Sequence, residues 1–455
     1  MQYSRIAVDR VDGLSVVGRN VSCQLPKFWL RSPPGPPGPS LSDDAAGGFR
    51  MSETTTAGSP VTMPTGRVDF FDPPAEFREL RATPVCRMRY PDGHVGWLVT
   101  GHGEARTVLS DPRFSARAEL RRSPIPRPGM DAIYGHPAPP GYFLAMDPPE
   151  QTRFRKPLTA HFTVRRMAAL HATVERLFVE RVDAMIDAGQ PSDLVADFAL
   201  PVPSLVICEL LGVPDADRAE FQRNAIVHLG LTSTAEESAA ALRSIVEYVQ
   251  TLARHKRDRP GDDLVSHLVT TTDLSDVELG GAGLLLLLGG HETTTNMLTL
   301  GTFALLRNPA QLRLLVADPG RIPAAVEELL RYLSIVQFSV VRTAIEDVDI
   351  DGIRIAAGET VTVSLPAGNR DPRKFASPDV LDIERATAGH LAFGHGVHQC
   401  IGQQLARVEM RAGFATLLGR LPDIRLAVPD DEVELGYDLS IYGVHRMPVT
   451  WGDGR

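Results

Sequence analysis

The sequence predicts a mainly α-helical fold with one long central helix and only small β-sheets. Apolar residues recur at helical spacing through three long segments, residues 164–189, 192–212 and 215–255. A further run extends from about residue 276 to 308, and a helix of that length would span roughly 50 Å. Alternating β-type patterns occur only in short runs, so strands should be a minor part of the structure.

The amino-terminal stretch differs in character from the rest of the chain. Its tract from Ser32 to Ser40 is dominated by proline and glycine and cannot form a helix or a central strand. We therefore expect residues 1–65 to be a disordered leader or a mis-assigned extension, and residues 66–455 to form the folded domain. The string Met51-Ser52-Glu53-Thr54 resembles a natural start.

Two hairpins and a long loop are predicted outside the helices. Val85–Tyr90 and Val95–Thr100 flank the turn residues Pro91-Asp92-Gly93, which indicates a β-hairpin. Residues 348–362 alternate around a second glycine-containing turn and predict another hairpin. Between these regions, Ser123–Tyr142 is rich in proline and glycine and should form an ordered loop.

Charge and composition narrow the classes of function. A formal net charge of −9, with no basic tract interleaved with aromatic residues, argues against a nucleic-acid-binding protein. The apolar run Leu279–Gly290 is too short to span a membrane, and the amino terminus lacks the order of a signal peptide. We therefore expect a cytoplasmic protein without membrane association. A reducing compartment and the absence of a zinc site are indicated by four widely separated cysteines, Cys23, Cys86, Cys208 and Cys400.

The predicted central helix is weakest in its middle. Ser275 and Glu278 have the spacing of a capping box and should open the helix. Gly289 and Gly290, followed by the β-branched residues 293–295, then lower its intrinsic stability at the centre. Local weakness at the centre of an element often marks a functional site, although a kink in a core helix is the alternative explanation.

The segment Phe393–Gly402 holds a cysteine where a loop gives way to a helix. Apolar residues recur at helical spacing from Ile401 onward, which places Cys400 near a helix amino terminus. The helix dipole and free backbone amides there favour the anionic form of the sulfur. A thiolate held in this way suits ligation of a soft metal or haem iron, or nucleophilic attack. An isolated cysteine in such a turn is more often simply buried.

The string Phe-Gly-x-Gly-x-His-x-Cys-x-Gly resembles the haem-binding loop of the cytochrome P450 family, and the resemblance covers roughly residues 68 to 452. It implies one large, mainly helical domain that binds haem b (iron protoporphyrin IX) and uses O2 as co-substrate. It further implies that Cys400 is the proximal ligand of the iron and that Phe393 packs beside the sulfur in the turn made by Gly394. His398 would then reach a haem propionate.

The same resemblance gives the weak centre of the long helix a catalytic meaning. Gly289 and Gly290 would leave room for dioxygen, and Glu292 and Thr293 would be the acid–alcohol pair. Cleavage of an O–O bond requires protons, and a carboxylate and a hydroxyl can relay them through ordered water. Loop 123–142 would cover the distal face and help to select the substrate.

Haem propionates are expected to meet Arg155, Arg342 and the side chain at position 151. Asp147 is suited to cap the helix that carries Gln151 and Arg155, which are four residues apart and share a face. Many bacterial relatives have histidine where this chain has Gln151. Glutamine can donate a hydrogen bond but carries no charge, so this contact departs from the family pattern.

Two further groups of residues follow from the resemblance. Glu328 and Arg331, joined by Arg385, would form a buried structural ion-pair network that locks the haem-binding core. Four residues would line the substrate pocket: Val336, Phe338, Ile441 and Tyr442.

These features predict a monomeric haem-thiolate monooxygenase that hydroxylates a mostly apolar natural product. The chain has no GxGxxG strand–helix unit and no four-cysteine cluster, so electrons would come from NAD(P)H through a separate ferredoxin and ferredoxin reductase. An acidic ferredoxin could dock on a basic face comprising Arg153, Lys156, Arg165, Arg166, Arg407 and Arg411, although solvated helix arginines would give the same pattern.

Three other functions are compatible with parts of the pattern. The same haem could be used for peroxide-driven oxidation, or for oxidative coupling, desaturation or ring closure without oxygen insertion. A non-catalytic haem sensor or carrier would have little need for Glu292 and Thr293. A hydrolase with Cys400 as nucleophile would need a base and an orienting partner, and no such pattern accompanies this cysteine.

Overall fold

The structure is a computed structural model that describes residues 59–126, 134–229, 234–436 and 441–452. The predicted leader lies mostly outside the described residues. The boundary predicted after residue 65 is too late, because Val61 already belongs to the fold. Its amide donates to the carbonyl of Arg87 at 2.9 Å, and its carbonyl accepts from the amide of Arg89 at 2.8 Å. The Met63 side chain is buried nearby.

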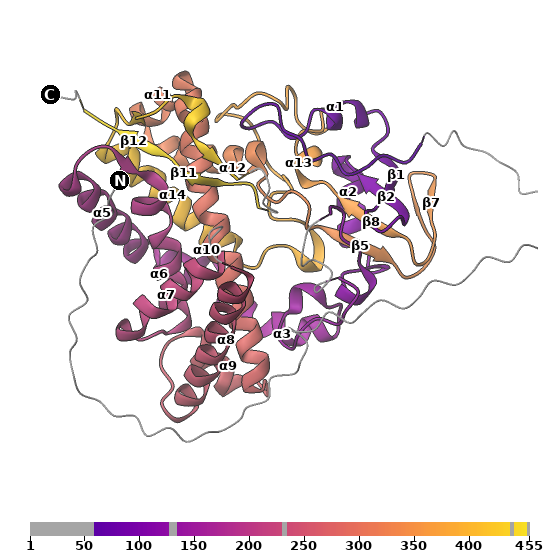
Figure 1. Cartoon of the computed structure of the whole chain (residues 1–455), viewed down its shortest axis with the longest axis horizontal. Helices are drawn as coiled ribbons and strands as arrows, with labels where there is room; N and C mark the ends of the chain where they lie inside the picture. Colours follow the sequence, from indigo (N-terminus) through magenta and orange to yellow (C-terminus); the bar gives the residue numbers. More distant parts are fainter. Residues whose placement is uncertain (1–58, 127–133, 230–233, 437–440, 453–455) are drawn as a thin grey trace, which may run out of the picture. The chain divides into compact units, whose positions relative to one another are not determined.

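Helices form most of the described chain, as the sequence predicts (Figure 1). The longest is α10 (Asp276–Arg307), which runs through the midst of the other helices. It begins with the predicted capping box, in which Ser275 and Glu278 each bond the other's backbone amide. The other helices are α1 (Glu76–Leu80), α2 (His102–Ser110), α3 (Glu150–Thr159), α4 (Val164–Ala169), α5 (His171–Ala188), α6 (Pro201–Leu211), α7 (Asp215–Leu229), α8 (Ala235–Asp258), α9 (Leu264–Thr271), α11 (Pro309–Ala317), α12 (Ile322–Leu333), α13 (Leu365–Gly368) and α14 (Gln403–Arg420).

Three helical predictions need correction in detail. Segment 192–212 begins as the short strand β4 (Ser192–Asp193) and a single π-helical turn, η5 (Leu194–Ala199), before α6 starts. Segment 215–255 is two helices, α7 and α8. Asp147 does not cap α3, because its carboxylate instead accepts hydrogen bonds from the Ser115 hydroxyl at 2.6 Å and the Ala116 amide at 2.7 Å.

The strands form small sheets, the largest with the order β1-β2-β8-β5-β3. Both predicted hairpins are present: β1 pairs antiparallel with β2, and β6 pairs with β7. The last part of segment 348–362 departs from the prediction, since β8 pairs with β2 and β5 instead. The strand bounds are β1 (Val85–Arg89), β2 (Val95–Val99), β3 (Phe114–Ser115), β5 (Val341–Ala344), β6 (Val348–Ile350), β7 (Ile353–Ile355), β8 (Thr360–Val363), β9 (Arg425–Leu426), β10 (Glu434–Leu435), β11 (Val444–Arg446) and β12 (Pro448–Thr450).

The main core lies among α5, α6, α10, α12 and α14, and α10 contributes an almost continuous buried surface to it. One helical stretch in the described part of the chain, Leu194–Leu211, has the length and apolarity of a membrane span, with a mean hydropathy of 1.9. Two-thirds of that stretch (67%) is buried inside the protein, as in the core helix of a globular domain.

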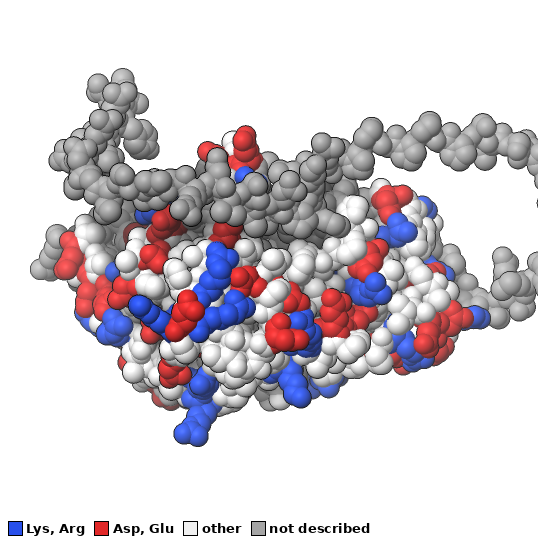
Figure 2. Space-filling model, turned by 90° about the horizontal axis from the view of Figure 1, so that it is seen from below, with Lys and Arg blue, Asp and Glu red and all other residues white. Residues whose placement is uncertain are grey.

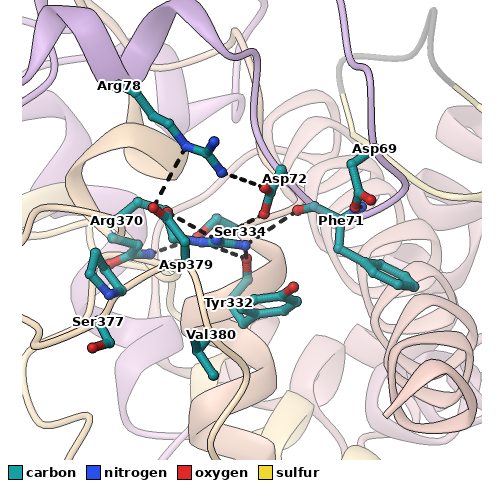
Figure 3. A network of polar contacts seen from close by, with 12 residues as sticks. Asp69, Phe71, Asp72, Arg78, Tyr332, Ser334, Arg370, Ser377, Asp379 and Val380 are labelled. Atoms are coloured by element: carbon teal, nitrogen blue, oxygen red, sulfur yellow. Dashed lines mark hydrogen bonds and ion pairs between the residues drawn. The ribbon is translucent and has the colours of Figure 1, made fainter.

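A buried arginine fastens the first described segment to this core (Figure 3). Arg370 is 1% exposed and pairs with Asp72 at 3.0 Å and Asp379 at 3.2 Å. It also donates to the carbonyls of Tyr332 at 3.0 Å and Phe71 at 3.4 Å. Charge-assisted hydrogen bonds of this kind are strong when desolvated, so they hold residues 67–72, which we call the strap, against α12.

Candidate functional site

The cysteine loop is a glycine-dependent turn that ends at α14. Cys400 lies between the 3₁₀ turn η7 (Gly396–His398) and the start of α14, and its amide donates to the carbonyl of Phe393 at 2.8 Å. Gly394 and Gly396 have φ values of 68° and 71°, in the left-handed region that favours glycine. A Cβ on Gly396 would lie 2.1 Å from the Leu109 carbonyl oxygen. The turn that presents the sulfur therefore requires glycine at position 396.

The Cys400 sulfur has an environment with two opposing effects on its ionisation. Burial raises the pKa of the Cys400 thiol, whereas the backbone amides of Gly402 and Gln403 and the charge of Arg155 act in the other direction. The sequence predicted only the anion-favouring effect. The Cys400 residue is exposed by surface area, and it lines a partly open pocket of about 360 Å³ together with residues of α3, α4 and the start of α14. The residue is thus accessible on the side of α3 and α4.

Buried basic residues converge near this loop from separate elements. Arg342, in β5, is 7% exposed, and burial together with the nearby charge of Arg121 lowers its pKa to about 10. Burial, Arg342, Arg155 and Arg121 lower the pKa of His398 to about 3. Among the described residues, neither ring nitrogen of His398 has a hydrogen-bond partner. Buried polar atoms are rarely left unpaired, so these groups fit an anionic ligand.

Gln151 and Arg155 both lie on α3, as the sequence predicts. In the described structure their side chains contact the cysteine loop. The side-chain amide of Gln151 donates to the Val397 carbonyl at 2.9 Å. The Arg155 guanidinium donates to the carbonyl of Gln399, the residue before Cys400. In the described structure these two side chains dock α3 on the loop. Arg155 also lies within electrostatic range of His398, which places it near the other basic residues.

The two glycines of α10 have different surroundings, contrary to the shared role predicted for them. A Cβ on Gly289 would meet nothing within 4 Å, so this position leaves open space. A Cβ on Gly290 would lie 2.6 Å from Cδ1 of Ile207 in α6. Gly290 is therefore needed for helix packing. The Thr293 hydroxyl donates to the Gly289 carbonyl at 2.6 Å, and Glu292 is half-buried beside it.

The predicted ion-pair network is assembled, and its Glu328–Arg331 pair is fully buried. Arg331 donates to the two carboxylate oxygens of Glu328 at 2.7 and 2.8 Å, and both side chains are 0% exposed. Arg385 adds a contact to Glu328 at 3.2 Å, and the Asp382 amide adds one at 3.0 Å. Arg331 also donates to the Asn369 carbonyl at 2.9 Å, which ties α12 to the segment leading to the cysteine loop.

Two of the four predicted pocket residues lie elsewhere. Phe338 is 5% exposed and packs in a separate core cluster beside the β1–β2 hairpin. Tyr442 is 1% exposed, and its hydroxyl donates to the Phe70 carbonyl at 2.7 Å while Arg67 stacks 4.0 Å over its ring. Val336 and Ile441 face each other in an isolated β-bridge and are only partly buried. They remain candidates for the pocket wall.

Most of the predicted basic docking residues are occupied by acidic partners. Arg407 pairs with Glu327 at 2.7 Å and stacks over Phe393 at 4.6 Å, which gives it a structural place beneath the cysteine loop. Arg411 lies 3.6 Å from the same carboxylate. Arg153 pairs with Glu278, and Arg166 lies 3.7 Å from Asp262 and also contacts His161. Basic and acidic groups also lie side by side on the face shown in Figure 2. In the described part of the chain, no carboxylate pairs with the remaining exposed residues, Lys156 and Arg165.

Three charged residues near the site were not identified from the sequence: Arg121 and Glu409 are buried, and Glu327 is half-buried. Arg121 lies in an irregular segment that carries no motif. Glu327 precedes the predicted Glu328 and accepts hydrogen bonds from His390 and Arg407, which outweigh its burial and lower its pKa to about 2. Glu409 of α14 is fully enclosed, and burial raises its pKa to about 8. In the sequence both glutamates have the pattern of ordinary solvated helix residues.

The donor set fits a haem. Cys400 provides one soft sulfur ligand on a preformed turn, and a haem iron accepts such a thiolate. Arg155, Arg342 and His398 provide charge and hydrogen-bond donors for the two carboxylates of the macrocycle. The unpartnered ring nitrogens of His398 are the clearest sign that this cluster is complete only with an anion in place.

Comparisons with known proteins agree with this chemistry. The family model for Cytochrome P450 matches residues 322–427, which include α12 and the cysteine loop. Cytochrome P450 105C1 of a Streptomyces species is 46% identical over 398 residues, covering 87% of this chain and 100% of the relative. Cytochrome P450-SU2 of Streptomyces griseolus is 48% identical over 404 residues, covering 88% and 99%.

Two further similarities involve proteins whose names include a small molecule. Pentalenic acid synthase of Streptomyces avermitilis is 42% identical over 402 residues, covering 87% of this chain and 99% of the relative. A crystal structure of CYP105P1 in complex with filipin I is similar with a TM-score of 0.79 and 43% identity, covering 87% of this chain and 100% of that chain. With such identity along almost the whole length of these relatives, the chain belongs to the cytochrome P450 family of haem-dependent, O2-using monooxygenases.

Proposed function

We propose that this enzyme hydroxylates a mostly apolar natural product in secondary metabolism, with haem b as its cofactor. The observation that carries the proposal is the placement of Cys400 on a glycine turn that also presents His398, whose ring nitrogens have no partner among the described residues, with the buried Arg342 in electrostatic range. When bound, a haem with a thiolate ligand supplies the activation of O2. Cys400 would hold the iron, and Arg155, Arg342 and His398 would bind the haem carboxylates and so orient the cofactor.

Residues of α10 handle the protons that the reaction consumes. The Thr293 hydroxyl lies over the open space beside Gly289, and its present acceptor is the Gly289 carbonyl at 2.6 Å. A rotation of this hydroxyl transfers its donor function to a reacting oxygen. Glu292 is the adjacent acid that returns the proton from solvent, since a carboxyl can exchange protons with water on each turnover.

The substrate class is inferred from the apolar character of the site and from the relatives. Leu285 and Leu288 of α10 and the bridged pair Val336 and Ile441 are partly buried apolar residues near the cysteine loop or the long helix. One relative is a pentalenic acid synthase, and the similar protein CYP105P1 has been crystallised in complex with filipin I. A medium-sized, mostly apolar molecule is the corresponding substrate class for this chain.

Electrons come from NAD(P)H through a separate ferredoxin and ferredoxin reductase, and the enzyme is a cytoplasmic monomer. Lys156 and Arg165 are the best docking candidates, because in the described part of the chain no carboxylate neutralises them. Charge reversal at both positions should slow electron transfer at low ionic strength and lose its effect at high salt. If the charge-reversed variant accepted electrons at the wild-type rate at low salt, Lys156 and Arg165 would not form the docking face.

The test of the proposal is the carbon-monoxide difference spectrum of the reduced protein. A strongly red-shifted Soret band is expected from thiolate ligation by Cys400. Cys400→His should abolish that band, whereas Cys86→Ser, a matched change at another thiol in the described chain, should keep it. A histidine-type spectrum or no haem in the wild-type protein would contradict the proposal.

Product analysis under labelled O2 separates hydroxylation from the other uses of the haem. A substrate found by a low-to-high-spin shift of the ferric protein should gain one labelled oxygen atom. A product that is coupled, desaturated or cyclised without labelled oxygen would replace hydroxylation by one of those reactions. No turnover of any ligand that shifts the spin state would favour a sensor or carrier.

A further inference from the structure

Arg121 is held beside the strand that carries Arg342. It follows the 3₁₀ turn η2 (Ala118–Leu120), and the Leu120 carbonyl accepts a hydrogen bond from the Thr343 hydroxyl at 2.7 Å. The preceding strand β3 pairs with β5 through Ser115 and Thr343. These contacts fix the backbone of the segment on the sheet, so the position of Arg121 next to Arg342 is built into the fold.

The Arg121 side chain is buried, although one of its own donors has no partner. It is 9% exposed, and Nε lacks a hydrogen-bond acceptor among the described residues. Its neighbour Arg122 is different, because it is solvent-exposed and pairs with Asp92. A buried guanidinium with an unpaired N–H donor carries the desolvation cost of that donor. The burial of Arg121 therefore indicates that an anion completes this site.

The carboxylates near Arg121 accept hydrogen bonds from other groups. Asp147 acts electrostatically on both Arg121 and Arg342, but its oxygens accept from Ser115 and Ala116. Glu119 also acts on Arg121, and its carboxylate accepts from Arg117 at 2.7 Å. Besides these carboxylates and two tyrosines, Arg121 lies within electrostatic range of two further basic residues, Arg342 and His398.

We propose that Arg121 is a further anchor for a haem carboxylate, in addition to Arg155, Arg342 and His398. This inference rests on the proposed haem function and adds a residue from the segment before loop 123–142. A guanidinium can bind a carboxylate through two parallel hydrogen bonds, and Nε is one of the donors that such a fork uses. Tyr134 packs against the guanidinium, with 5.5 Å between Cζ and the ring centre, and thereby limits its movement.

The rate of haem loss from the ferric holoenzyme to excess apomyoglobin tests the anchor without any turnover. We expect Arg121→Gln to accelerate haem loss roughly tenfold, as expected for one charge-assisted hydrogen bond. Arg121→Lys keeps the charge without the fork and should lie between wild type and Arg121→Gln. Arg122→Gln is the matched control, with the same charge change one residue away, and should lose haem at the wild-type rate.

A second readout identifies the carboxylate as the partner. Resonance Raman bands of propionate bending should shift in Arg121→Gln and stay unchanged in Arg122→Gln. Reconstitution with haem dimethyl ester should accelerate loss less in Arg121→Gln than in wild type, because the contact is already absent. If Arg121→Gln cannot be purified in folded form, the Raman shift of Arg121→Lys decides the question.

The outcomes distinguish this inference from the proposed function. If Arg121→Gln lost haem at the wild-type rate and kept the propionate band unchanged, Arg121 would not be a propionate anchor. Haem-thiolate ligation would be unaffected by that result. Equal acceleration in Arg121→Gln and Arg122→Gln would assign the effect to general charge and would also overturn it. A wild-type protein that binds no haem would instead refute the proposed function.

Discussion

At the scale of single residues, Glu409 shows how strongly burial can change the chemistry of a group. One carboxylate oxygen accepts from the Thr294 hydroxyl at 3.3 Å, and the other has no partner among the described residues. Burial therefore raises its pKa to about 8, and the carboxyl is mainly protonated at neutral pH. The sequence could not predict this state, because the glutamate stands in an ordinary helical pattern between arginines.

The pKa of Glu409 predicts a fall of stability with rising pH. The folded pKa is about 8, above the unfolded value near 4.3, so the folded state binds the extra proton between these limits. The free energy of unfolding then falls as pH rises from about 5 to 8, by at most about 1.4 kcal/mol per pH unit. Glu409→Gln should flatten this slope in urea unfolding measured at each pH.

Glu327 provides a control of opposite sign. Its pKa is lowered to about 2, so its stabilising effect is present above the unfolded pKa and is lost as pH falls from about 4.3 toward 2. Glu327→Gln should lower stability by a constant amount between pH 5 and 8. If the free energy of unfolding of the wild-type protein changed as little with pH as that of Glu409→Gln, the Glu409 carboxyl would not be neutral in the folded state.

The Thr293 hydroxyl is predicted to affect the coupling of NAD(P)H consumption to product formation more than the binding of substrate. A positioned proton donor contributes about 10²–10⁴-fold to such a step. Thr293→Ala should therefore reduce product formed per NAD(P)H roughly tenfold or more, with the difference appearing as hydrogen peroxide. Thr293→Ser retains the hydroxyl and should keep most of the coupling. Equal coupling in the alanine variant and wild type would exclude this role.

At the scale of elements, the contact between α6 and α10 depends on a glycine that the sequence assigned to ligand space. The motif placed Gly289 and Gly290 together, but a helix turns by about 100° per residue, so neighbours face different surroundings. Gly289 faces open space and Gly290 faces Ile207. Periodicity showed that the segment is helical, yet one sequence cannot show which helix packs on which face.

Alanine at the two glycines should therefore have opposite effects. Gly289→Ala should raise stability by about 0.5–1 kcal/mol through helix propensity. Gly290→Ala gains the same propensity but overpacks Ile207, at a cost of about 1–3 kcal/mol, so a net loss is expected. Combining Gly290→Ala with Ile207→Val should recover part of the loss in thermal or urea unfolding. Equal effects of the two alanines would disprove the contact.

Elements that depend on residues close together in the sequence were predicted correctly. The capping box of α10 and the hairpin β1–β2 depend on residues a few positions apart, and both are present. The π-helical turn η5 was missed because its cause is tertiary: the Leu194 amide donates to the Met447 carbonyl at 3.0 Å, far away in the chain. Tertiary contacts of this kind override local periodicity.

At the scale of the whole molecule, long-range ion pairs join segments that the sequence treats as unrelated. The family resemblance correctly joined Arg385 to Glu328 and Arg331, which lie far apart in the chain. It gave no partner for Arg370, whose contact with Asp72 spans 298 positions. It also placed Phe338 and Tyr442 in the pocket, since it could not show that both side chains turn into the core.

Removal of Arg370 should detach the strap from the core. Arg370→Ala removes the buried donor to the Tyr332 and Phe71 carbonyls, while Asp72 and Asp379 keep Arg78 and Arg81 as partners, and it should cost about 1–3 kcal/mol. Hydrogen exchange should accelerate in peptides covering residues 67–80. Arg78→Ala is the control, because Arg78 binds the same Asp72 but is 55% exposed, and it should cost at most about 1 kcal/mol. Similar hydrogen exchange in Arg370→Ala and Arg78→Ala would show that Arg370 does not hold the strap against the core.

The strap has a consequence for how the chain is made. Phe70 and Phe71 pack on Phe303, and the Phe70 carbonyl is bonded by Tyr442, which is 372 positions later in the chain. At a synthesis rate of about 5–20 residues per second, the ribosome needs roughly 20–70 s to make that interval. Until Phe303 has been made, the nascent chain carries two adjacent phenylalanines without the native ring on which both pack. Such a segment is a natural target for a chaperone, and premature termination before Tyr442 would leave it without its last hydrogen bond.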